Sequence, residues 1–274
     1  MSDRICLYTP PFDWIESYRQ VIDLAVDNGM SVIEGFNCFE FSQPDLAKAR
    51  EIRAYADRKG VRFACLSVYA DVSGENAEQE VQKVKAYAQI ASILGSPYLH
   101  HTIAPEHNTP DHGSLETFYQ KGLHSVREIY DYAETQGVKT VYEDQGYVFN
   151  GVDGFGRFLR DVNRDVAVVM DLGNIFQTDE SPEAFIETFA SKIVHTHIKD
   201  VSYSREYREG WYQTLHGNYF TCNRPGDGII DIPHCIRLLE AAGYTGCYGL
   251  EFSAGPGGDA SMKAYIEQAK AWLK

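Results

Sequence analysis

Eight short apolar runs alternate with longer helical patterns along the chain, and this alternation limits the possible folds more than any other feature. The runs are short and bounded by turn residues, whereas the segments between them carry apolar residues at helical spacing. Repeated strand–helix units of this kind form a parallel sheet, and eight of them close a barrel. The predicted strands lie at residues 4–9, 31–36, 62–69, 97–103, 140–144, 166–172, 193–199 and 247–252.

Length and turn chemistry agree with one α/β barrel. The chain has 274 residues and 44% hydrophobic side chains, which suits a single barrel of about 250 residues. We therefore expect one (β/α)8 TIM-barrel domain over residues 1–274. The one long insertion, at about 203–229, follows the seventh strand, on the face where the loops of such barrels build the active site. Five helical patterns end at a glycine suited to a left-handed cap: Gly29, Gly60, Gly95, Gly137 and Gly243.

Four polar side chains end four successive strands in the second half of the chain. They are Glu143, Asp171, His197 and Glu251. Because the carboxyl ends of neighbouring parallel strands converge, these side chains are expected to meet. Each one alone is equally consistent with a hydrogen-bonded core group that closes the top of the barrel. Three carboxylates together repel one another unless a cation lies between them, which favours a metal site.

The ligand types indicate which ions would suit the site. Three carboxylates and one imidazole fit a hard or borderline divalent ion, and no cysteine occupies these positions to favour structural zinc. We expect Mn²⁺, with Mg²⁺, Co²⁺ or Zn²⁺ as alternatives.

With these residues in place, the chain resembles the xylose isomerase-like TIM-barrel superfamily, and within it the sugar phosphate isomerase/epimerase group that includes D-tagatose 3-epimerase. The resemblance covers essentially the whole length. It is carried by Glu143 and by the motifs MDLGN at 170–174, VHTHIKD at 194–200, GDGIID at 226–231 and AAGYTGCYGLE at 241–251.

The resemblance implies roles for particular residues. The metal ligands of the group correspond to Glu143, Asp171, His197 and Glu251, and its catalytic acid/base pair corresponds to Glu143 and Glu251. One residue departs from the pattern, because the ketose 3-epimerases carry a substrate-binding histidine three residues after the metal-binding aspartate, where this chain has Asn174. We therefore expect Asn174 to bind a substrate other than a simple ketohexose, such as an inosose or an oxidised sugar.

The expected chemistry is removal of a proton next to a carbonyl. A cation would stabilise the enediolate while a carboxylate takes the proton. Return of the proton to the opposite face gives an epimerase, return to the neighbouring carbon gives an isomerase, and departure of a β-hydroxyl gives a dehydratase. We expect a sugar isomerase or epimerase, with dehydration of a keto-sugar or inosose as the alternative; the sequence does not choose among these outcomes.

Four further polar residues are candidates for substrate binding. Lys199 shares strand parity with His197 and would point inward near the mouth. Glu34 and His101, or its neighbour His100, end the second and fourth strands. Arg205 lies in the long seventh insertion, where its guanidinium suits a phosphate or carboxylate. Each also has a purely structural alternative. Lys199 could form an ion pair, Glu34 and the histidine could be hydrogen-bonded groups at the end of the barrel, and Arg205 could be a solvated charge in a loop. Six aromatic residues near the predicted mouth are candidates for stacking on a sugar: Tyr8, Phe12, Trp14, Phe36, Tyr69 and Trp211.

Charge and cysteine usage bound the partners. The formal charge of −14 disfavours a nucleic-acid partner. Two alternative functions are less consistent with the sequence. An endonuclease IV-like DNA-repair enzyme would need additional metal ligands. A sugar-binding barrel without catalysis would tolerate the loss of a ligand, whereas all four are present here. The six scattered cysteines indicate a reduced, cytoplasmic protein. No apolar run approaches the roughly 20 residues that span a bilayer, so we expect no membrane-spanning segment. We expect a small sugar-derived molecule as substrate, and a homodimer or homotetramer as a possible assembly.

Overall fold

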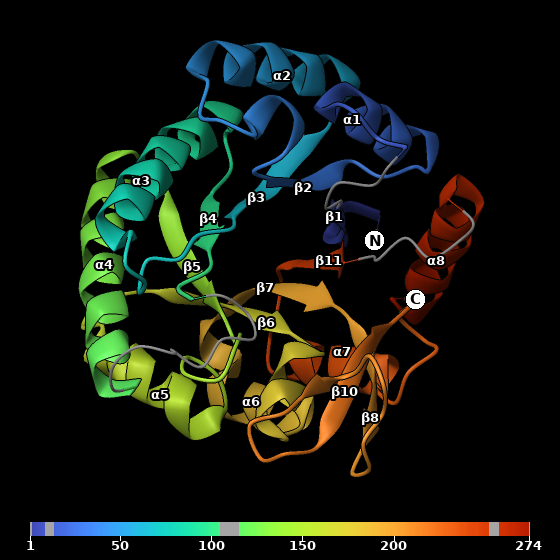
Figure 1. Ribbon diagram of the computed structural model, residues 1–274. Coiled ribbons are helices and arrows are strands. Elements are labelled where there is room, and N and C mark those ends of the chain that lie inside the picture. The colour runs from blue at the N-terminus through green and yellow to red at the C-terminus, as the bar shows by residue number, and fades with distance from the viewer. Residues whose placement is uncertain (1, 9–13, 105–114, 252–257, 274) are drawn as a thin grey trace.

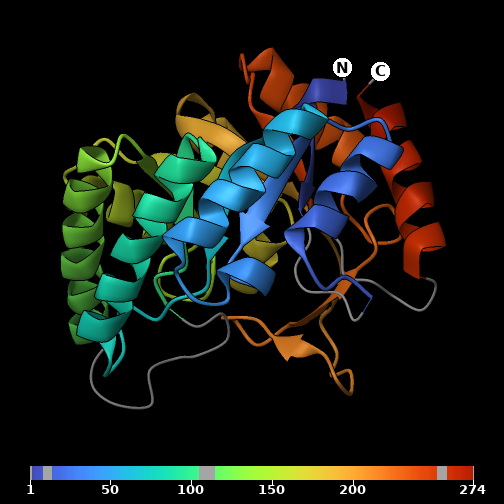
Figure 2. The ribbon, with the colours of Figure 1, turned by 90° about the horizontal axis from the view of Figure 1, so that it is seen from above.

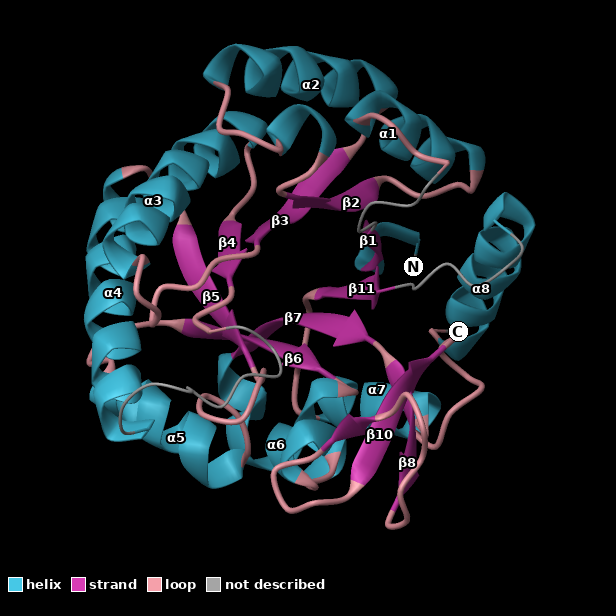
Figure 3. Ribbon diagram, in the orientation of Figure 1, coloured by secondary structure: helices cyan, strands magenta, loops and turns pink. Residues whose placement is uncertain are grey.

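The computed structural model confirms the predicted barrel. It describes residues 2–8, 14–104, 115–251 and 258–273, and eight parallel strands close a ring in the order β1-β11-β7-β6-β5-β4-β3-β2. Figures 1 and 3 show this ring from one end, with the helices arranged around its outside. Every strand of this ring pairs with a parallel neighbour on each side.

The strand and helix bounds follow the predicted alternation closely. The barrel strands are β1 Ile5–Tyr8, β2 Val32–Phe36, β3 Arg62–Val68, β4 Tyr98–His101, β5 Lys139–Glu143, β6 Ala167–Asp171, β7 Ile193–Ile198 and β11 Cys247–Glu251. The helices are α1 Tyr18–Asp27, α2 Leu46–Lys59, α3 Ala77–Leu94, α4 Leu115–Thr135, α5 Val152–Asp161, α6 Pro182–Phe189, α7 Ile232–Ala241 and α8 Gly258–Trp272.

Local chemistry explains where these helices begin and end. At the start of α2, the Asp45 carboxylate accepts hydrogen bonds from the backbone N–H groups of Ala47 and Lys48. The helix ends at Gly60, whose φ of 69° lies in the left-handed region that favours glycine. The same conformation occurs at the other four predicted glycine caps, where φ is 67° to 87°. The turn residues therefore release the chain from each of these helices toward the next strand.

The interior of the barrel changes character along its axis. Apolar side chains of Cys65, Val141, Ala167 and Val169 form one buried cluster between the strands. Nearer the carboxyl ends, the buried interior groups are polar, and they include Glu34, His100, His195 and His197. A much larger apolar core lies between the sheet and the surrounding helices. Active sites of such barrels lie at the carboxyl ends of the strands, so this polar layer lies at the end of the barrel where an active site is expected.

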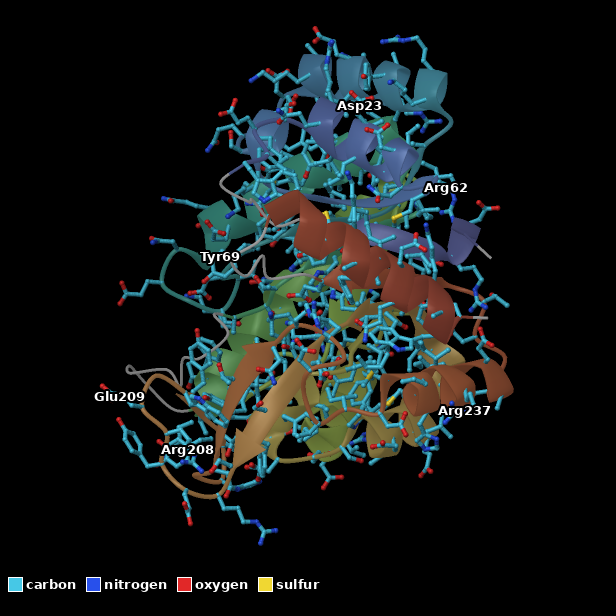
Figure 4. The ribbon with its side chains drawn as sticks, turned by 90° about the vertical axis from the view of Figure 1, so that its right-hand side faces the viewer. Asp23, Arg62, Tyr69, Arg208, Glu209 and Arg237 are labelled. Carbon is cyan, nitrogen blue, oxygen red and sulfur yellow. The ribbon has the colours of Figure 1, made fainter. Side chains whose placement is uncertain are left out.

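The long insertion differs from the expected loop. It contains a three-stranded antiparallel sheet in the order β8-β10-β9, with β8 Asp200–Ser204, β9 Tyr212–Gln213 and β10 Tyr219–Asn223. Figure 2 shows this orange sheet on one side of the barrel and both chain ends on the opposite side. Figure 4 places Arg62, the first residue of β3, and Tyr69, just after that strand, toward opposite sides of the molecule.

Two further expectations concern cysteines and membranes. All six cysteines are free, and five of them are buried. Among the described residues, none of the helices combines the length and apolar character that a membrane span requires.

Candidate functional site

The four predicted ligands lie together at the carboxyl ends of β5, β6, β7 and β11. These strands are consecutive neighbours in the ring, and Asp171 of β6 stands opposite His197 of β7 in the register. One potential ligand atom from each of Glu143, Asp171, His197 and Glu251 lies within 4.8 Å of the others. His197 Nδ1 is 2.5 Å from Glu143 Oε1 and 3.6 Å from Glu251 Oε2.

The cluster concentrates negative charge in a buried place. Two unit charges 4.8 Å apart repel by about 3 kcal/mol at an effective dielectric constant of about 20. Three such pairs among the carboxylates would cost about as much as the whole stability of a typical protein, 5–15 kcal/mol. The cluster therefore needs protons or cations to compensate its charge.

The protein supplies one of these cations itself. Lys199 Nζ lies 3.0 Å from Asp171 Oδ2 and 2.9 Å from Glu251 Oε1. The same ammonium donates a hydrogen bond to Asn174 Oδ1 at 3.0 Å. Lys199 thus links Asn174 to two carboxylates of the cluster, Asp171 and Glu251.

Protonation compensates the remaining charge. Burial is the main cause that raises the pKa of Glu251 to about 8, and Asp171 adds to it despite the opposing effect of Lys199. Burial also raises the pKa of Glu143, against the opposing effect of His197. Burial alone would lower the pKa of His197, but Glu34 and Glu143 raise it well above its usual value. The raised pKa values of Glu251 and His197 favour the protonated forms of these side chains, and a metal ion would have to displace those protons.

We predict that metal affinity rises with pH, because ions compete with protons on groups whose pKa values are raised. The apparent Kd for Mn²⁺ should fall by about tenfold per pH unit for each displaced proton, as pH rises from 6 toward 8. Calorimetric titration in two buffers of different ionisation enthalpy counts the protons released. An affinity that is independent of pH, without proton release, would contradict the prediction.

The backbone and a second acid hold Asp171 in place. Its Oδ1 accepts hydrogen bonds from the backbone N–H groups of Gly173 and Asn174, at 2.7 and 2.9 Å. Its own backbone N–H donates to Asp144 Oδ1 at 2.8 Å. Burial, followed by the charge of Asp171, raises the pKa of Asp144 well above its usual value. The other oxygen of Asp171, Oδ2, lies 3.0 Å from Lys199 Nζ.

The other predicted substrate-binding residues lie elsewhere. Glu34 has no exposed surface and lies under His197. His101 faces away from the barrel interior, with its ring nitrogens near the Thr102 carbonyl and the Tyr142 hydroxyl. Its neighbour His100 faces the interior instead, with Nε2 3.9 Å from Glu143 Oε2. Arg205 is exposed just after β8, outside the cluster.

The aromatic candidates have different positions. The Tyr8 ring stacks on His197, with centroids 4.9 Å apart. Phe36 contacts Tyr8 edge-on, whereas Tyr69 is largely exposed. Trp211 lines an open groove of the insertion together with Tyr147. Trp14 is also partly exposed, and Phe12 lies outside the described residues.

Sequence reasoning assigned no role to Ser67 or Asp144. Ser67 donates a hydrogen bond to Glu34 and approaches His100 Nδ1 at 3.0 Å. Its signal is a hydroxyl within the otherwise apolar run RFACLSVY. For Asp144 the signal is a second acid directly after Glu143 at a strand end. Neither pattern predicts which residue the side chain contacts, because that residue lies on another strand.

Comparisons with known proteins were consistent with the barrel. The model of the family described as xylose isomerase-like TIM barrel matches residues 15–274. An inosose dehydratase of Yersinia enterocolitica is 27% identical over 166 residues, which cover 58% of this chain and 55% of that relative. The match thus spans about half of the relative's length.

Two solved structures share the fold at low sequence identity. A probable 3-DHS dehydratase of Bacillus anthracis has a TM-score of 0.76 and 17% identity, with 97% of this chain and 98% of that one covered. A D-psicose 3-epimerase of Clostridium cellulolyticum H10 has a TM-score of 0.76 and 15% identity, with 99% of each chain covered. These likenesses show that one architecture serves both dehydratases and epimerases. Because the family match runs from residue 15 to residue 274, this chain belongs to the xylose isomerase-like TIM barrel family.

Proposed function

We propose that the protein is a divalent-metal-dependent enzyme that removes a proton next to the carbonyl of a keto-sugar or cyclic keto-polyol, and that dehydration is the reaction its site supports best. The observation that carries the choice is the 2.9 Å contact between Lys199 Nζ and Glu251 Oε1. It places a general acid directly beside a candidate general base. The partial match to an inosose dehydratase supports the same substrate class.

The residues present fit a divalent ion. Glu143, Asp171 and Glu251 offer three carboxylates, and His197 offers one imidazole nitrogen, all within reach of one centre. With Lys199, a doubly charged ion would balance the three carboxylates. Oxygen-rich ligand sets suit Mn²⁺ or Mg²⁺, and we propose Mn²⁺. When bound, such an ion supplies positive charge beside the oxygen atoms of the enediolate.

The side chains divide the reaction between them. Glu251 takes the proton from the carbon next to the carbonyl, and the electron pair of that C–H bond forms the enediolate. The electrons then return and break the C–O bond of the β-hydroxyl, which leaves as water after taking a proton from the Lys199 ammonium. Glu251 is then protonated and Lys199 neutral, and their direct contact lets the proton pass back to Lys199. The net change is loss of one water from the substrate.

Epimerisation is the second candidate, because another carboxylate flanks the same centre. Glu143 ends β5 and Glu251 ends β11, and His197 Nδ1 lies between them at 2.5 and 3.6 Å. Two carboxylates on different sides of a bound sugar are suited to remove a proton from one face and return it to the other. In that reaction Lys199 would only orient a substrate oxygen.

The mass of the product separates the two reactions. Protein loaded with Mn²⁺ is incubated with a panel of inososes, oxidised sugars and ketohexoses, and the products are analysed by mass spectrometry and NMR. Loss of one water from an inosose or oxidised sugar is the expected result. An unchanged mass with inverted configuration would select epimerisation, and conversion of none of these compounds would overturn the proposal.

The role of Lys199 gives a separate prediction. Lys199→Met should lower the kcat of dehydration by about 10²- to 10⁴-fold, because no acid remains to protonate the leaving hydroxyl. The affinity of the Lys199→Met variant for Mn²⁺ should equal or exceed that of the wild type, because a positive charge next to the proposed ion is removed. Steady-state kinetics and metal titration measure both effects, with exposed Lys192→Met as the matched control. Wild-type turnover in Lys199→Met would exclude the acid role.

A further inference from the structure

A buried carboxylate beneath the metal cluster has three hydrogen-bonding partners. Glu34 on β2 has no exposed surface. Ser67 Oγ donates to its Oε1 at 2.5 Å, and His195 Nε2 lies 2.6 Å from its Oε2. His197 Nε2 lies 3.2 Å from both of its oxygens. Groups from β3 and β7 therefore hold both oxygens of this fully buried side chain.

The two nitrogens of His197 face different groups. Nδ1 points to the ligand cluster, where Glu143 and Glu251 lie, whereas Nε2 points to Glu34. A histidine that binds a metal through one nitrogen needs a hydrogen on the other, and a carboxylate that accepts this hydrogen sets both the tautomer and the ring orientation. The position of Glu34 meets this requirement.

Packing fixes the same ring from its sides. Tyr8 stacks on His197 with an interplanar angle of 20°. At Gly249 on the neighbouring strand β11, a Cβ atom would lie 3.0 Å from His197 Cδ2 and 3.3 Å from Glu34 Oε2. The absence of a side chain at Gly249 thus leaves the space in which the carboxylate and the imidazole meet.

A second metal site is the competing interpretation of Glu34. Ligand atoms of Cys6, Glu34 and His195 also lie within 4.8 Å of one another. Two observations argue against it. The short contact between His195 and Glu34 is that of a hydrogen bond, with a proton in the place of an ion. Burial also raises the pKa of the Cys6 thiol well above its usual value, and a thiol binds metals as the thiolate.

We propose that Glu34 is a positioning residue, which holds His197 with Nδ1 directed at the ligand cluster, and that Ser67 and His195 in turn hold Glu34. This role rests on the metal site proposed above. It predicts that Glu34 governs metal affinity and coordination geometry without touching the metal or the substrate. In Glu34→Gln, the amide offers one acceptor and one NH₂ donor where the carboxylate offers only acceptors, so the hydrogen bond to His197 is weakened or lost.

Cobalt titration tests the proposal, because the visible absorption of Co²⁺ reports the geometry of its ligands. Wild-type protein should bind one Co²⁺ per chain. Glu34→Gln should bind it about 10- to 100-fold more weakly, with a shifted visible spectrum. Exposed Glu187→Gln on α6 is the matched control and should bind Co²⁺ as the wild type does, with the same spectrum. Ser67→Ala removes one donor to Glu34 but leaves its contacts with His195 and His197, so it should weaken Co²⁺ binding less than Glu34→Gln does.

The outcomes separate this role from the metal site itself. Wild-type protein that binds no Co²⁺ would overturn the metal site and the role of Glu34 together. Equal affinity and spectra in wild type and Glu34→Gln would overturn only the role of Glu34. Two Co²⁺ per chain, reduced to one in Glu34→Gln, would make Glu34 a ligand of a second site.

A measurement on the wild-type protein covers the case in which Glu34→Gln does not fold. Protein labelled with ¹⁵N-histidine and loaded with diamagnetic Zn²⁺ is studied by NMR. His197 should carry its hydrogen on Nε2 and bind the ion through Nδ1. The opposite arrangement, with the ion on Nε2, would contradict the proposal.

Discussion

Glu251→Gln is expected to reduce kcat by about 10³-fold or more, while the protein remains folded. An amide fills the same space but cannot accept the proton from the carbon next to the carbonyl, and general base catalysis contributes about 10²- to 10⁴-fold. It also loses the ion pair with Lys199, so both the base and the partner of the acid are changed at once. Steady-state kinetics on the best substrate, with circular dichroism to verify the fold, measure the effect.

Glu143→Gln is the informative companion to this variant. If Glu143 is the second acid/base group, its loss should abolish epimerisation to a similar degree. If Glu143 serves only as a ligand, excess Mn²⁺ should restore part of the turnover. Exposed Glu187→Gln on α6 is the matched control and should behave as wild type. Undiminished turnover in Glu251→Gln would remove Glu251 from the mechanism.

Asp171→Asn is expected to abolish metal binding and activity together. Its Oδ1 can still accept the two backbone hydrogen bonds that shape the turn, so the loss falls mainly on the charge presented to the ion. Mn²⁺ at about 100 times its Kd should add about 2.7 kcal/mol to the free energy of unfolding of the wild type and almost nothing to that of the variant. Denaturation with and without Mn²⁺ measures this difference. An equal gain in both proteins would place the ion elsewhere.

Local patterns were sufficient to predict the barrel. Each barrel strand is a short apolar run between turn residues, and five of the helices are followed within two residues by a glycine with positive φ. The four-residue cluster followed from one further rule, that parallel strands converge at their carboxyl ends. Glu143, Asp171, His197 and Glu251 meet because β5, β6, β7 and β11 are neighbours in the ring.

The remaining site depends on details that sequence spacing does not fix. The register of β2 shifts between Ile33 and Glu34, at the residue whose side chain lies under His197. On β4, two adjacent histidines point to opposite sides of the sheet, and the sequence alone does not say which of His100 and His101 faces inward. Contacts between distant strands, such as Ser67 with Glu34, decide these positions.

The insertion illustrates a different difficulty. Its strands β8 and β10 pair antiparallel across a long connection, and their mixture of polar and apolar, buried and partly exposed residues gives a weak strand signal. Such a segment is predicted as a loop unless the strand with which it pairs is known. Arg205, which was predicted to bind substrate, belongs to this segment and lies exposed beside β8.

The fate of one hydrogen tests the central claim of metal-assisted proton abstraction most directly. A keto-polyol substrate deuterated at the carbon next to the carbonyl is converted by the Mn²⁺-loaded protein, and NMR follows the deuterium. The account predicts that deuterium enters water as product forms, and that the metal-free protein releases none. Deuterium retained in the product on the neighbouring carbon would show a hydride shift, and release without metal would show that the ion is not required; either result would contradict the account.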